Sequence, residues 1–121
     1  MREILFRGKR LDTGAWTYGY VDATMYKDIV VIHTDNGTHQ VDINTVGQYT
    51  GFTDKDGNKI FEDDILNVYG RPAVVRYSAE YAMFRLDRLL GYYYLFSDFE
   101  EDATVIGNFH DNPELLKEDN K

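Results

Sequence analysis

The run Asp54-Lys55-Asp56-Gly57-Asn58 comes nearest, in its residue types, to a metal-binding motif. Carboxylate and amide oxygens are the ligands that calcium takes in an EF-hand loop, which also needs glycine at the sixth position and glutamate at the twelfth. Counted from Asp54, those two positions hold Lys59 and Ile65. The run therefore fails the calcium test, and its Asp, Gly and Asn residues predict an ordinary β-turn.

A second group of carboxylates follows at Glu62-Asp63-Asp64. These side chains could bind a divalent cation together with Asp54 or Asp56, because hard cations prefer oxygen ligands. No spacing rule makes such a cluster diagnostic. We interpret the group as a solvated acidic turn. A metal-dependent enzyme that uses this turn is the least favoured of the three hypotheses about function given below.

The histidines and serines do not form a recognisable catalytic arrangement. The chain has three histidines, His33, His39 and His110, and the first two lie in one predicted hairpin whose register directs them to opposite faces. Ser78 and Ser97 lack the glycine elbow of a nucleophilic serine. No Gly-rich stretch continues as a phosphate-binding loop. The sequence therefore predicts no catalytic residue, no cofactor and no metal ligand, and we expect a protein that is not an enzyme.

Aromatic residues make up 15% of the chain and supply the candidate binding surface. Two interpretations stay open. Alternate aromatic residues fill the core while the others cover the surface of the sheet, or the aromatic residues form a protein interface, where Tyr and Trp give rigid contact area. Three consecutive tyrosines in a strand cannot all point inward. The candidate interface residues are Trp16, Tyr18, Tyr20, Tyr92, Tyr93 and Tyr94.

Composition limits the classes of function. The chain has 121 residues and no Cys, so disulfides and thiolate metal sites are excluded. Its net charge of −8 disfavours direct binding to nucleic acid, whose phosphates need basic contacts. No run approaches the roughly 20 apolar residues of a membrane span, and the charged segment from Met1 to Arg7 does not resemble a signal peptide. We expect a cytoplasmic protein with no membrane contact.

Short runs with a period of two predict an all-β fold. Strands are expected near residues 3–7, 16–21, 29–32, 38–43, 46–52, 59–61, 65–69, 73–77, 82–87 and 104–109. Residues 92–99 fit either a strand or a helix, and we expect a strand that gives way to a helical turn near 97–100. Asn112 before Pro113 predicts a short C-terminal helix over 113–117.

The pair Asn36-Gly37 predicts a tight hairpin with those two residues as its loop. In that register Ile32 faces Val41 and Val30 faces Ile43, so that apolar residues meet on one face. The predicted chain is a single domain with an N-terminal β subdomain at about 1–46, a barrel-like, SH3-like β subdomain at about 47–112, and a short helix and tail at 113–121.

Three blocks of the sequence together resemble the YopX family of phage and plasmid proteins. They are REILFR at 2–7, GQYTGFTDKDGNKIFEDDI at 47–65, and VIGNFHDNPELL at 105–116. The resemblance implies an all-β protein with two subdomains, one a small barrel, that has a tendency to assemble into rings and is encoded on mobile elements of bacteria. It implies no particular chemistry. The chain departs from the family at Asp63, where glycine is usual, but Asp also adopts left-handed backbone geometry and the turn should survive.

We therefore favour a non-enzymatic phage or prophage accessory protein that acts through self-assembly into a homo-oligomer, such as a ring, and through contact with a host or phage protein. The second hypothesis is an acidic inhibitor or nucleic-acid mimic directed at a host protein, and its motive is the charge of −8. The metal-dependent enzyme that uses the acidic turn is the third.

Overall fold

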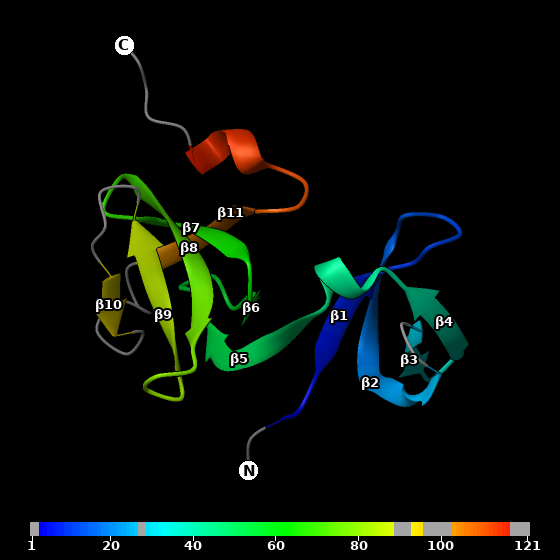
Figure 1. Cartoon of the computed structure of the whole chain (residues 1–121). Coiled ribbons are helices and arrows are strands. Elements are labelled where there is room, and N and C mark those ends of the chain that lie inside the picture. The colour runs from blue at the N-terminus through cyan, green and yellow to red at the C-terminus, as the bar shows by residue number, and fades with distance from the viewer. Residues whose placement is uncertain (1–2, 27–28, 89–92, 96–102, 117–121) are drawn as a thin grey trace. The chain divides into compact units, whose positions relative to one another are not determined.

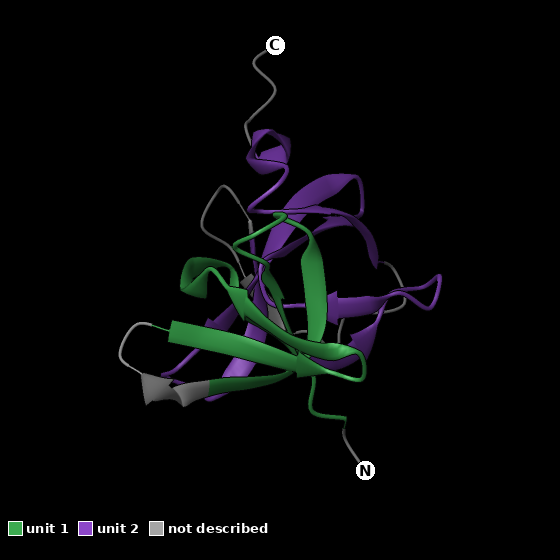
Figure 2. Ribbon diagram, turned by 90° about the vertical axis from the view of Figure 1, so that its right-hand side faces the viewer, with its two compact units in different colours: residues 1–49 green, residues 50–121 purple. Residues whose placement is uncertain are grey.

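A computed structural model describes residues 3–26, 29–88, 93–95 and 103–116 of the chain. The chain divides into two compact units, Met1–Tyr49 and Thr50–Lys121, which Figure 2 shows in separate colours. The predicted subdomain boundary lay after residue 46. Within the described ranges every regular element is a β-strand, apart from two short 3-10 turns, so the all-β prediction is confirmed.

The first unit is built from four antiparallel strands and the start of a fifth (Figure 1). The order of neighbours in the sheet is β4-β3-β2-β1-β5. The elements are β1 (Phe6–Lys9), β2 (Trp16–Tyr26), β3 (Ile29–Thr34), β4 (Gly37–Val41), the 3-10 turn η1 (Ile43–Thr45) and β5 (Gly47–Thr53), which continues into the second unit.

The core of the first unit lies on one face of this sheet. Val30, Ile32 and Val41 are buried there because alternate residues of a strand point to the same side. Gly19 of β2 allows β3 to approach closely, since a Cβ atom at this position would lie 2.1 Å from the carbonyl oxygen of His33. Glycine is therefore required by packing at Gly19.

The sheet of the first unit is curved, so that the end of its outer strand β4 forms backbone hydrogen bonds with the end of β1 and the residues after it. The amide of Leu11 donates to the Gln40 carbonyl at 3.0 Å, and the amide of Asp42 donates to the Lys9 carbonyl at 2.9 Å. These bonds satisfy part of the backbone of β4, which would otherwise be an open edge.

The predicted hairpin exists, but its register is wrong by two residues. Val30 pairs with Val41 and Thr34 pairs with Gly37, so the two-residue loop is Asp35-Asn36. The hydroxyl of Thr34 accepts from the Asn36 amide at 3.1 Å and donates to the Gly37 carbonyl at 3.0 Å, which stabilises the observed loop. A slip of two residues leaves every side chain on its original face.

Two details follow from the observed register. Ile43, the predicted partner of Val30, instead lies in η1 with its side chain exposed. His33 pairs with Thr38 and His39 pairs with Ile32, so the two histidines occupy adjacent pairs and point to opposite faces, as predicted.

The second unit contains an antiparallel sheet of five strands in the order β10-β9-β8-β7-β11. Its elements after β5 are β6 (Lys59–Phe61), β7 (Asp64–Val68), β8 (Arg71–Ser78), β9 (Met83–Arg88), β10 (Tyr93–Leu95), β11 (Ala103–Asn108) and the 3-10 turn η4 (Pro113–Leu116). The predicted barrel-like closure of this unit stays a prediction.

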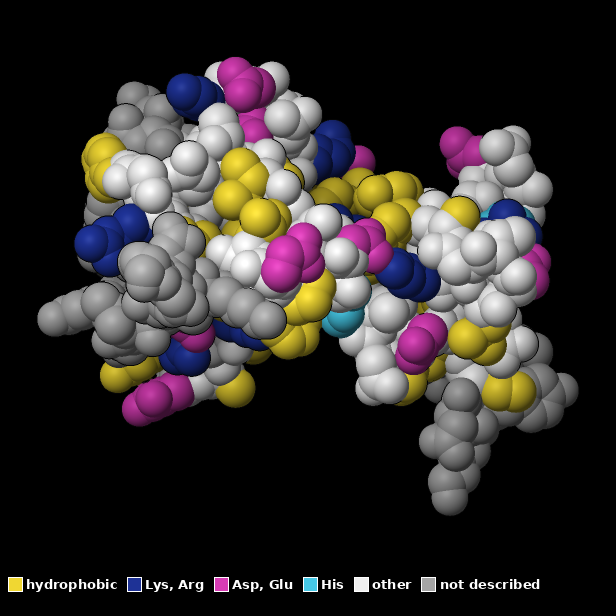
Figure 3. Space-filling view, turned by 90° about the horizontal axis from the view of Figure 1, so that it is seen from above, with side chains coloured by type: hydrophobic (Ala, Val, Ile, Leu, Met, Phe, Trp, Pro, Cys, Tyr) yellow, Lys and Arg dark blue, Asp and Glu magenta, His cyan; other side chains and the backbone are white. Residues whose placement is uncertain are grey.

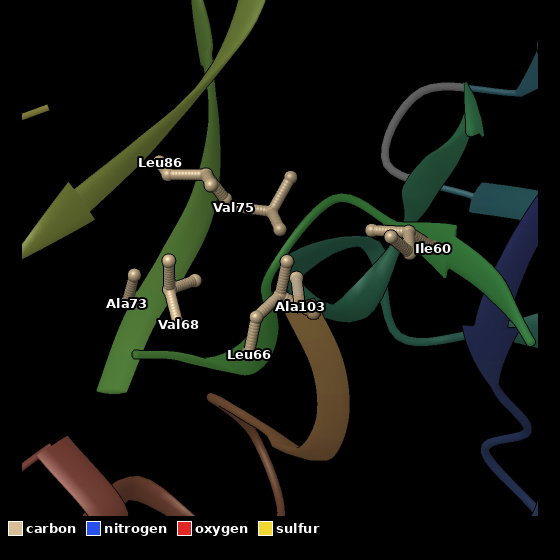
Figure 4. Close-up of a cluster of buried hydrophobic side chains, with 7 residues drawn as sticks. All are labelled: Ile60, Leu66, Val68, Ala73, Val75, Leu86 and Ala103. Atoms are coloured by element: carbon tan, nitrogen blue, oxygen red, sulfur yellow. The ribbon is translucent and has the colours of Figure 1, made fainter. Parts of the chain in front are cut away.

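Seven fully buried side chains form the core of the second unit (Figure 4). They come from β6, β7, β8, β9 and β11, so the core depends on segments from both ends of the unit. Its residues are Ile60, Leu66, Val68, Ala73, Val75, Leu86 and Ala103.

The C-terminal helix predicted over 113–117 is instead the single 3-10 turn η4, which packs against β8. The predicted cap is also used differently. The Asn112 side-chain oxygen accepts from the Asn108 amide at 3.2 Å, while the Asn112 carbonyl accepts from the Leu115 amide at 3.0 Å. The strand expected within 92–99 is β10, and the helical turn expected near 97–100 lies outside the described residues.

Candidate functional site

The first candidate surface is the outer face of β2, which carries Trp16, Tyr18 and Tyr20. These residues alternate along one strand and therefore share the face opposite the core. Tyr18 is 46% exposed and Tyr20 is 68% exposed, while Trp16 is half-buried. We call these three residues the aromatic face.

Two cations of β1 lie beside the aromatic face. Arg7 pairs with Tyr18 across the strands, and Lys9 pairs with Trp16. The guanidinium carbon of Arg7 is 4.6 Å from the centroid of the Trp16 ring, and the Lys9 Nζ atom is 5.5 Å from it. Both distances are within the range of cation–π attraction, so these contacts hold the indole in place. Arg7 is buried, at 6% exposed, whereas Lys9 is half-buried.

On the other side of the aromatic face, Tyr20 pairs with His33 of β3. His33 Nδ1 lies 2.9 Å from Thr38 Oγ1, and His33 Nε2 lies 3.4 Å from Asp22 Oδ2. This histidine therefore belongs to a polar network on the same outer face.

Tyr18 and Tyr20 do not fill the core, and their exposure is compatible both with aromatic residues that cover the sheet surface and with a protein interface. Whether the face binds a protein remains a prediction. Tyr93 and Tyr94 lie in β10, where their backbones pair with Asp87 and Leu86. Tyr92 lies outside the described residues.

A second exposed aromatic surface was not predicted from the sequence. It surrounds the turn between β8 and β9, where Tyr77 is 49%, Tyr81 57% and Met83 38% exposed. The Tyr77 ring packs edge-on against Phe84, with 5.3 Å between centroids. We call Tyr77, Tyr81, Met83 and Phe84 the hairpin tip. The available signal was composition, since Glu80 is the only charged residue between Tyr77 and Phe84, and turns are normally polar.

Large apolar side chains thus reach the surface of both units, and Figure 3 shows apolar side chains at the surface among charged ones. The charges are unevenly divided. Residues 1–49 contain five Lys or Arg and six Asp or Glu, whereas residues 50–121 contain eight and fifteen. The acidity of the chain therefore belongs mainly to the second unit.

The carboxylate of Asp54 organises the turn that was tested above as a calcium loop. It is 4% exposed, and its Oδ1 accepts from the amides of Asp56 at 2.9 Å and Asn58 at 2.8 Å. Its Oδ2 accepts from the Asn58 side chain at 3.1 Å and from the amide of Val105 in β11 at 3.0 Å. With φ 87°, Gly57 supplies the turn's left-handed position, so the β-turn prediction is confirmed.

Burial raises the pKa of the Asp54 carboxyl, but the donors of Val105, Asn58 and Asp56 lower it by more, so this pKa lies below its ordinary value of 3.8. Four protein donors therefore occupy both oxygens of a carboxylate that is ionised at neutral pH.

The solvated acidic turn predicted at 62–64 is wrong for two of its three residues. Asp64 is buried, and its Oδ2 accepts from the Phe61 amide at 2.8 Å. Asp63 adopts the left-handed geometry expected for it, with φ 73°. The Asp63 side chain is only 14% exposed and forms an ion pair with Arg76.

Asp63 also joins three segments that are distant in the sequence. Its amide donates to the Val75 carbonyl at 2.9 Å, and its carbonyl accepts from the Phe109 amide at 2.8 Å. The second carboxylate oxygen lies 3.0 Å from Nε2 of His110, and the Arg76 guanidinium carbon lies 4.7 Å from the Phe109 ring centroid. We call Asp63, Arg76, Phe109 and His110 the Asp63 clasp.

The loop that carries His110 is itself held by hydrogen bonds. The Asn108 side-chain oxygen accepts from the amides of His110 and Asp111, both at 2.9 Å. The sequence analysis missed this role of His110, because its partner Asp63 is 47 residues away. The carboxylates of Asp54, Asp63 and Asp64 are thus used to join backbone segments and side chains of the second unit.

Over the ranges that the structure describes, no three His, Cys, Asp or Glu side chains gather in an arrangement that could bind a metal ion. In the same ranges, no helix is long and apolar enough to span a membrane.

By its fold the chain is a two-unit, antiparallel all-β protein, and it carries exposed aromatic side chains on both units. The family model described as YopX protein matches residues 6–117, and the chain therefore belongs to the YopX family. No curated protein matches the chain in sequence.

The chain is also similar to a solved structure, the crystal structure of protein EF1440 from Enterococcus faecalis. The TM-score is 0.61 at 22% identity, and the match covers 97% of this chain and 100% of that one. At this identity the likeness extends to the fold alone.

Proposed function

We propose that this chain is a non-enzymatic accessory protein of a phage or prophage that acts in the bacterial cytoplasm by self-assembly and by contact with other proteins. The observation that supports this proposal is the exposure of Tyr18 and Tyr20 on the aromatic face. Tyrosines give up little rotamer entropy when they are buried, so they are effective contact residues.

The polar side chains support the same proposal. Asp54, Asp63 and Asp64 each accept hydrogen bonds from, or pair with, other residues of the second unit. Such carboxylates stabilise a fold and do not need a substrate to satisfy them. The family resemblance supplies the setting on a mobile element. The barrel-like closure of residues 47–112 is part of this proposal, as is a ring as the form of the homo-oligomer.

The test is the solution mass of the purified chain at concentrations from 1 to roughly 100 micromolar, measured by light scattering, because weak interfaces assemble only at higher concentration. We expect a mass well above the 14.1 kDa of one chain. In the double variant Tyr18→Ser/Tyr20→Ser, the solution mass should fall toward that of one chain. In Tyr69→Asn, which removes an exposed tyrosine outside the aromatic face, it should stay the same as in the natural chain. A monomer at every concentration would refute self-assembly.

The charge distribution favours one second function, an acidic inhibitor or nucleic-acid mimic directed at a host protein. The second unit contains fifteen acidic residues and eight basic ones, so it could compete with phosphates for a basic surface. The test is pull-down from a bacterial lysate with the immobilised chain. A bound host factor that is released by high salt would support this function, and the absence of any salt-sensitive factor would count against it.

A further inference from the structure

The loop between β3 and β4 contains an asparagine that is followed directly by glycine, Asn36-Gly37. Both residues are exposed, and they lie where the two strands of the hairpin end. A Cβ atom built on Gly37 would have no neighbour within 4 Å, so the space beside the Gly37 backbone is open. The peptide bond between these residues is therefore accessible to water and is not crowded by other side chains.

Asparagine before glycine undergoes one particular covalent reaction. The backbone nitrogen of the glycine loses its proton to hydroxide and attacks Cγ of the asparagine. A bond forms between this nitrogen and Cγ, the bond between Cγ and Nδ2 breaks, and the side-chain nitrogen leaves as ammonia. Water then opens the five-membered succinimide at one of its two carbonyls, which gives aspartate or isoaspartate. Glycine favours the reaction because it has no side chain to hinder the attack and its backbone rotates freely.

The hairpin restrains this reaction at one point only. Thr34 and Gly37 form the last pair of the ladder between β3 and β4. The end of a ladder is its least protected part, since it opens without disturbing the pairs behind it. Opening of this single pair lets the Gly37 nitrogen turn toward the Asn36 side chain, so the folded chain can react without unfolding.

The other five asparagines in the described ranges are held in ways that oppose the same reaction. Four of them have side chains in hydrogen bonds with neighbouring groups, namely Asn58, Asn67, Asn108 and Asn112. Asn112 also precedes Pro113, whose nitrogen has no proton to lose. Asn44 is exposed, but the amide of Thr45 after it donates to the Asp42 carbonyl at 2.9 Å, and Thr45 is β-branched and buried. Structure and sequence thus both single out Asn36.

Isoaspartate at this position would disturb the hairpin more than aspartate. It adds a methylene group to the backbone of a loop that has only two residues, Asp35 and Asn36. The Thr34 hydroxyl holds this loop, because it accepts from the Asn36 amide at 3.1 Å and donates to the Gly37 carbonyl at 3.0 Å. An extra backbone atom changes the spacing of these two groups. The strand that follows the loop contains Val41, which belongs to the core of the first unit.

We propose that Asn36 is a site of spontaneous deamidation in the folded chain, and that the isoaspartate product loosens the β3–β4 hairpin. Both products place a new carboxylate beside Asp35, so the loop gains one negative charge. The reaction consumes water and releases ammonia, and it requires no partner protein. The inference is therefore independent of the self-assembly proposed above.

The test incubates the natural chain at neutral and at mildly alkaline pH, beside a sample that is kept unfolded in urea. Mass spectrometry of proteolytic peptides reads each asparagine, since exchange of NH₂ for OH adds about 1 Da. Methyl transfer from S-adenosylmethionine by an isoaspartate-specific methyltransferase identifies the isoaspartate product. In the native chain, the peptide with Asn36 should react at least tenfold faster than the peptide with Asn44. Its rate should rise with pH, because the attacking nitrogen must lose a proton.

The matched control for the chemistry is Asn36→Gln. It keeps an exposed side-chain amide at the same place, but a longer side chain has to close a six-membered ring, so this variant should stay unmodified. An Asn36 that remains intact in the native chain would overturn the proposed site, and conversion in urea alone would show that the folded loop prevents the attack. Faster reaction at another described asparagine would overturn it as well.

Hydrogen exchange tests the effect of the product on the hairpin. In chains that contain isoaspartate at position 36, peptides from β3 and β4 should lose protection, whereas peptides from β7 and β8 should not. Asn36→Asp supplies the new charge without the extra backbone atom and should keep the protection of the natural chain. Equal protection of β3 and β4 in the isoaspartate form and in the fresh chain would overturn the proposed loosening.

Discussion

Replacement of Asp54 by Asn should destabilise the second unit although it changes only one carboxylate oxygen into an amide. In either orientation, the Asn side chain offers one oxygen to four donors. The better orientation keeps the oxygen on the amides of Asp56 and Asn58 and turns an NH₂ group toward the Val105 amide. The Asn58 side chain is exposed and can turn to water, but the half-buried amide of Val105 loses its acceptor.

An unmatched buried N–H costs about 1–3 kcal/mol, and the two retained bonds lose their charge assistance, which adds about 1 kcal/mol. We therefore expect Asp54→Asn to lower the free energy of unfolding of the second unit by about 2–4 kcal/mol. For a unit of this size that corresponds to a fall in Tm of roughly 10 °C or more. The matched control is Asp56→Asn in the same turn. Because the Asp56 side chain is exposed, this substitution should change the free energy of unfolding by less than about 0.5 kcal/mol.

Native-state hydrogen exchange read by mass spectrometry is the suitable assay, because it reports each unit separately. Peptides that cover β7 and β8 should lose protection in Asp54→Asn, and peptides from β2 and β3 serve as an internal reference. Fluorescence is less useful here, since the one tryptophan, Trp16, lies in the first unit.

The dependence on pH follows from the lowered pKa of Asp54. A carboxyl whose folded pKa lies below its unfolded value of 3.8 contributes its full stability above pH 3.8 and loses it as the pH falls through the folded pKa. The difference between the natural chain and Asp54→Asn should thus be constant from pH 5 to 7 and shrink below pH 3.8. Equal stability of the two chains at pH 7 would refute the role given to this carboxylate.

Three other substitutions test the fold. Gly19→Ala should cost about 2–3 kcal/mol in urea unfolding of the first unit, because its methyl group would meet the His33 carbonyl at 2.1 Å; a loss below 0.5 kcal/mol would contradict this packing. Tyr69→Asn should increase the free energy of unfolding of the second unit by about 0.5–1 kcal/mol and so raise its Tm, since Tyr69 has φ 55° and Asn tolerates that geometry better; a lower Tm would argue against this account. Asp63→Ala and Asp63→Gly should both unfold at lower urea concentrations than the natural chain, because both lose the contacts to Arg76 and His110. Asp63→Ala should be the less stable of the two, because only Ala strains the left-handed backbone; the reverse order would reject this account.

Local patterns in the sequence were sufficient to predict most of the strands. Alternation predicted β2, and the β-branched run from Ile29 to Ile32 predicted β3. The prediction of the hairpin register failed because a slip of two residues leaves every side chain on the same face. The observed register also gains two hydrogen bonds of the Thr34 hydroxyl within the loop. No period in the sequence encodes such a hydrogen bond.

The candidate sites were harder to predict, since they depend on contacts between distant residues. The burial of Asp54 depends on Val105, and the role of Asp63 depends on Arg76 and His110. From composition alone these acids looked solvated. The exposure of Tyr81 was equally hidden, because an aromatic residue near a strand end is consistent with core or surface.

The hydrogen bond from Val105 to Asp54 spans 51 residues and has a consequence for synthesis of the chain. The first unit has four complete strands and the start of β5 within the first 49 residues, and it can fold while translation continues. The turn organised by Asp54 cannot form all its hydrogen bonds until β11 has left the ribosome, since before then the Asp54 carboxylate lacks the donor from Val105. The growing chain should therefore pass through a stage in which its N-terminal half is finished and its acidic half is still unfolded.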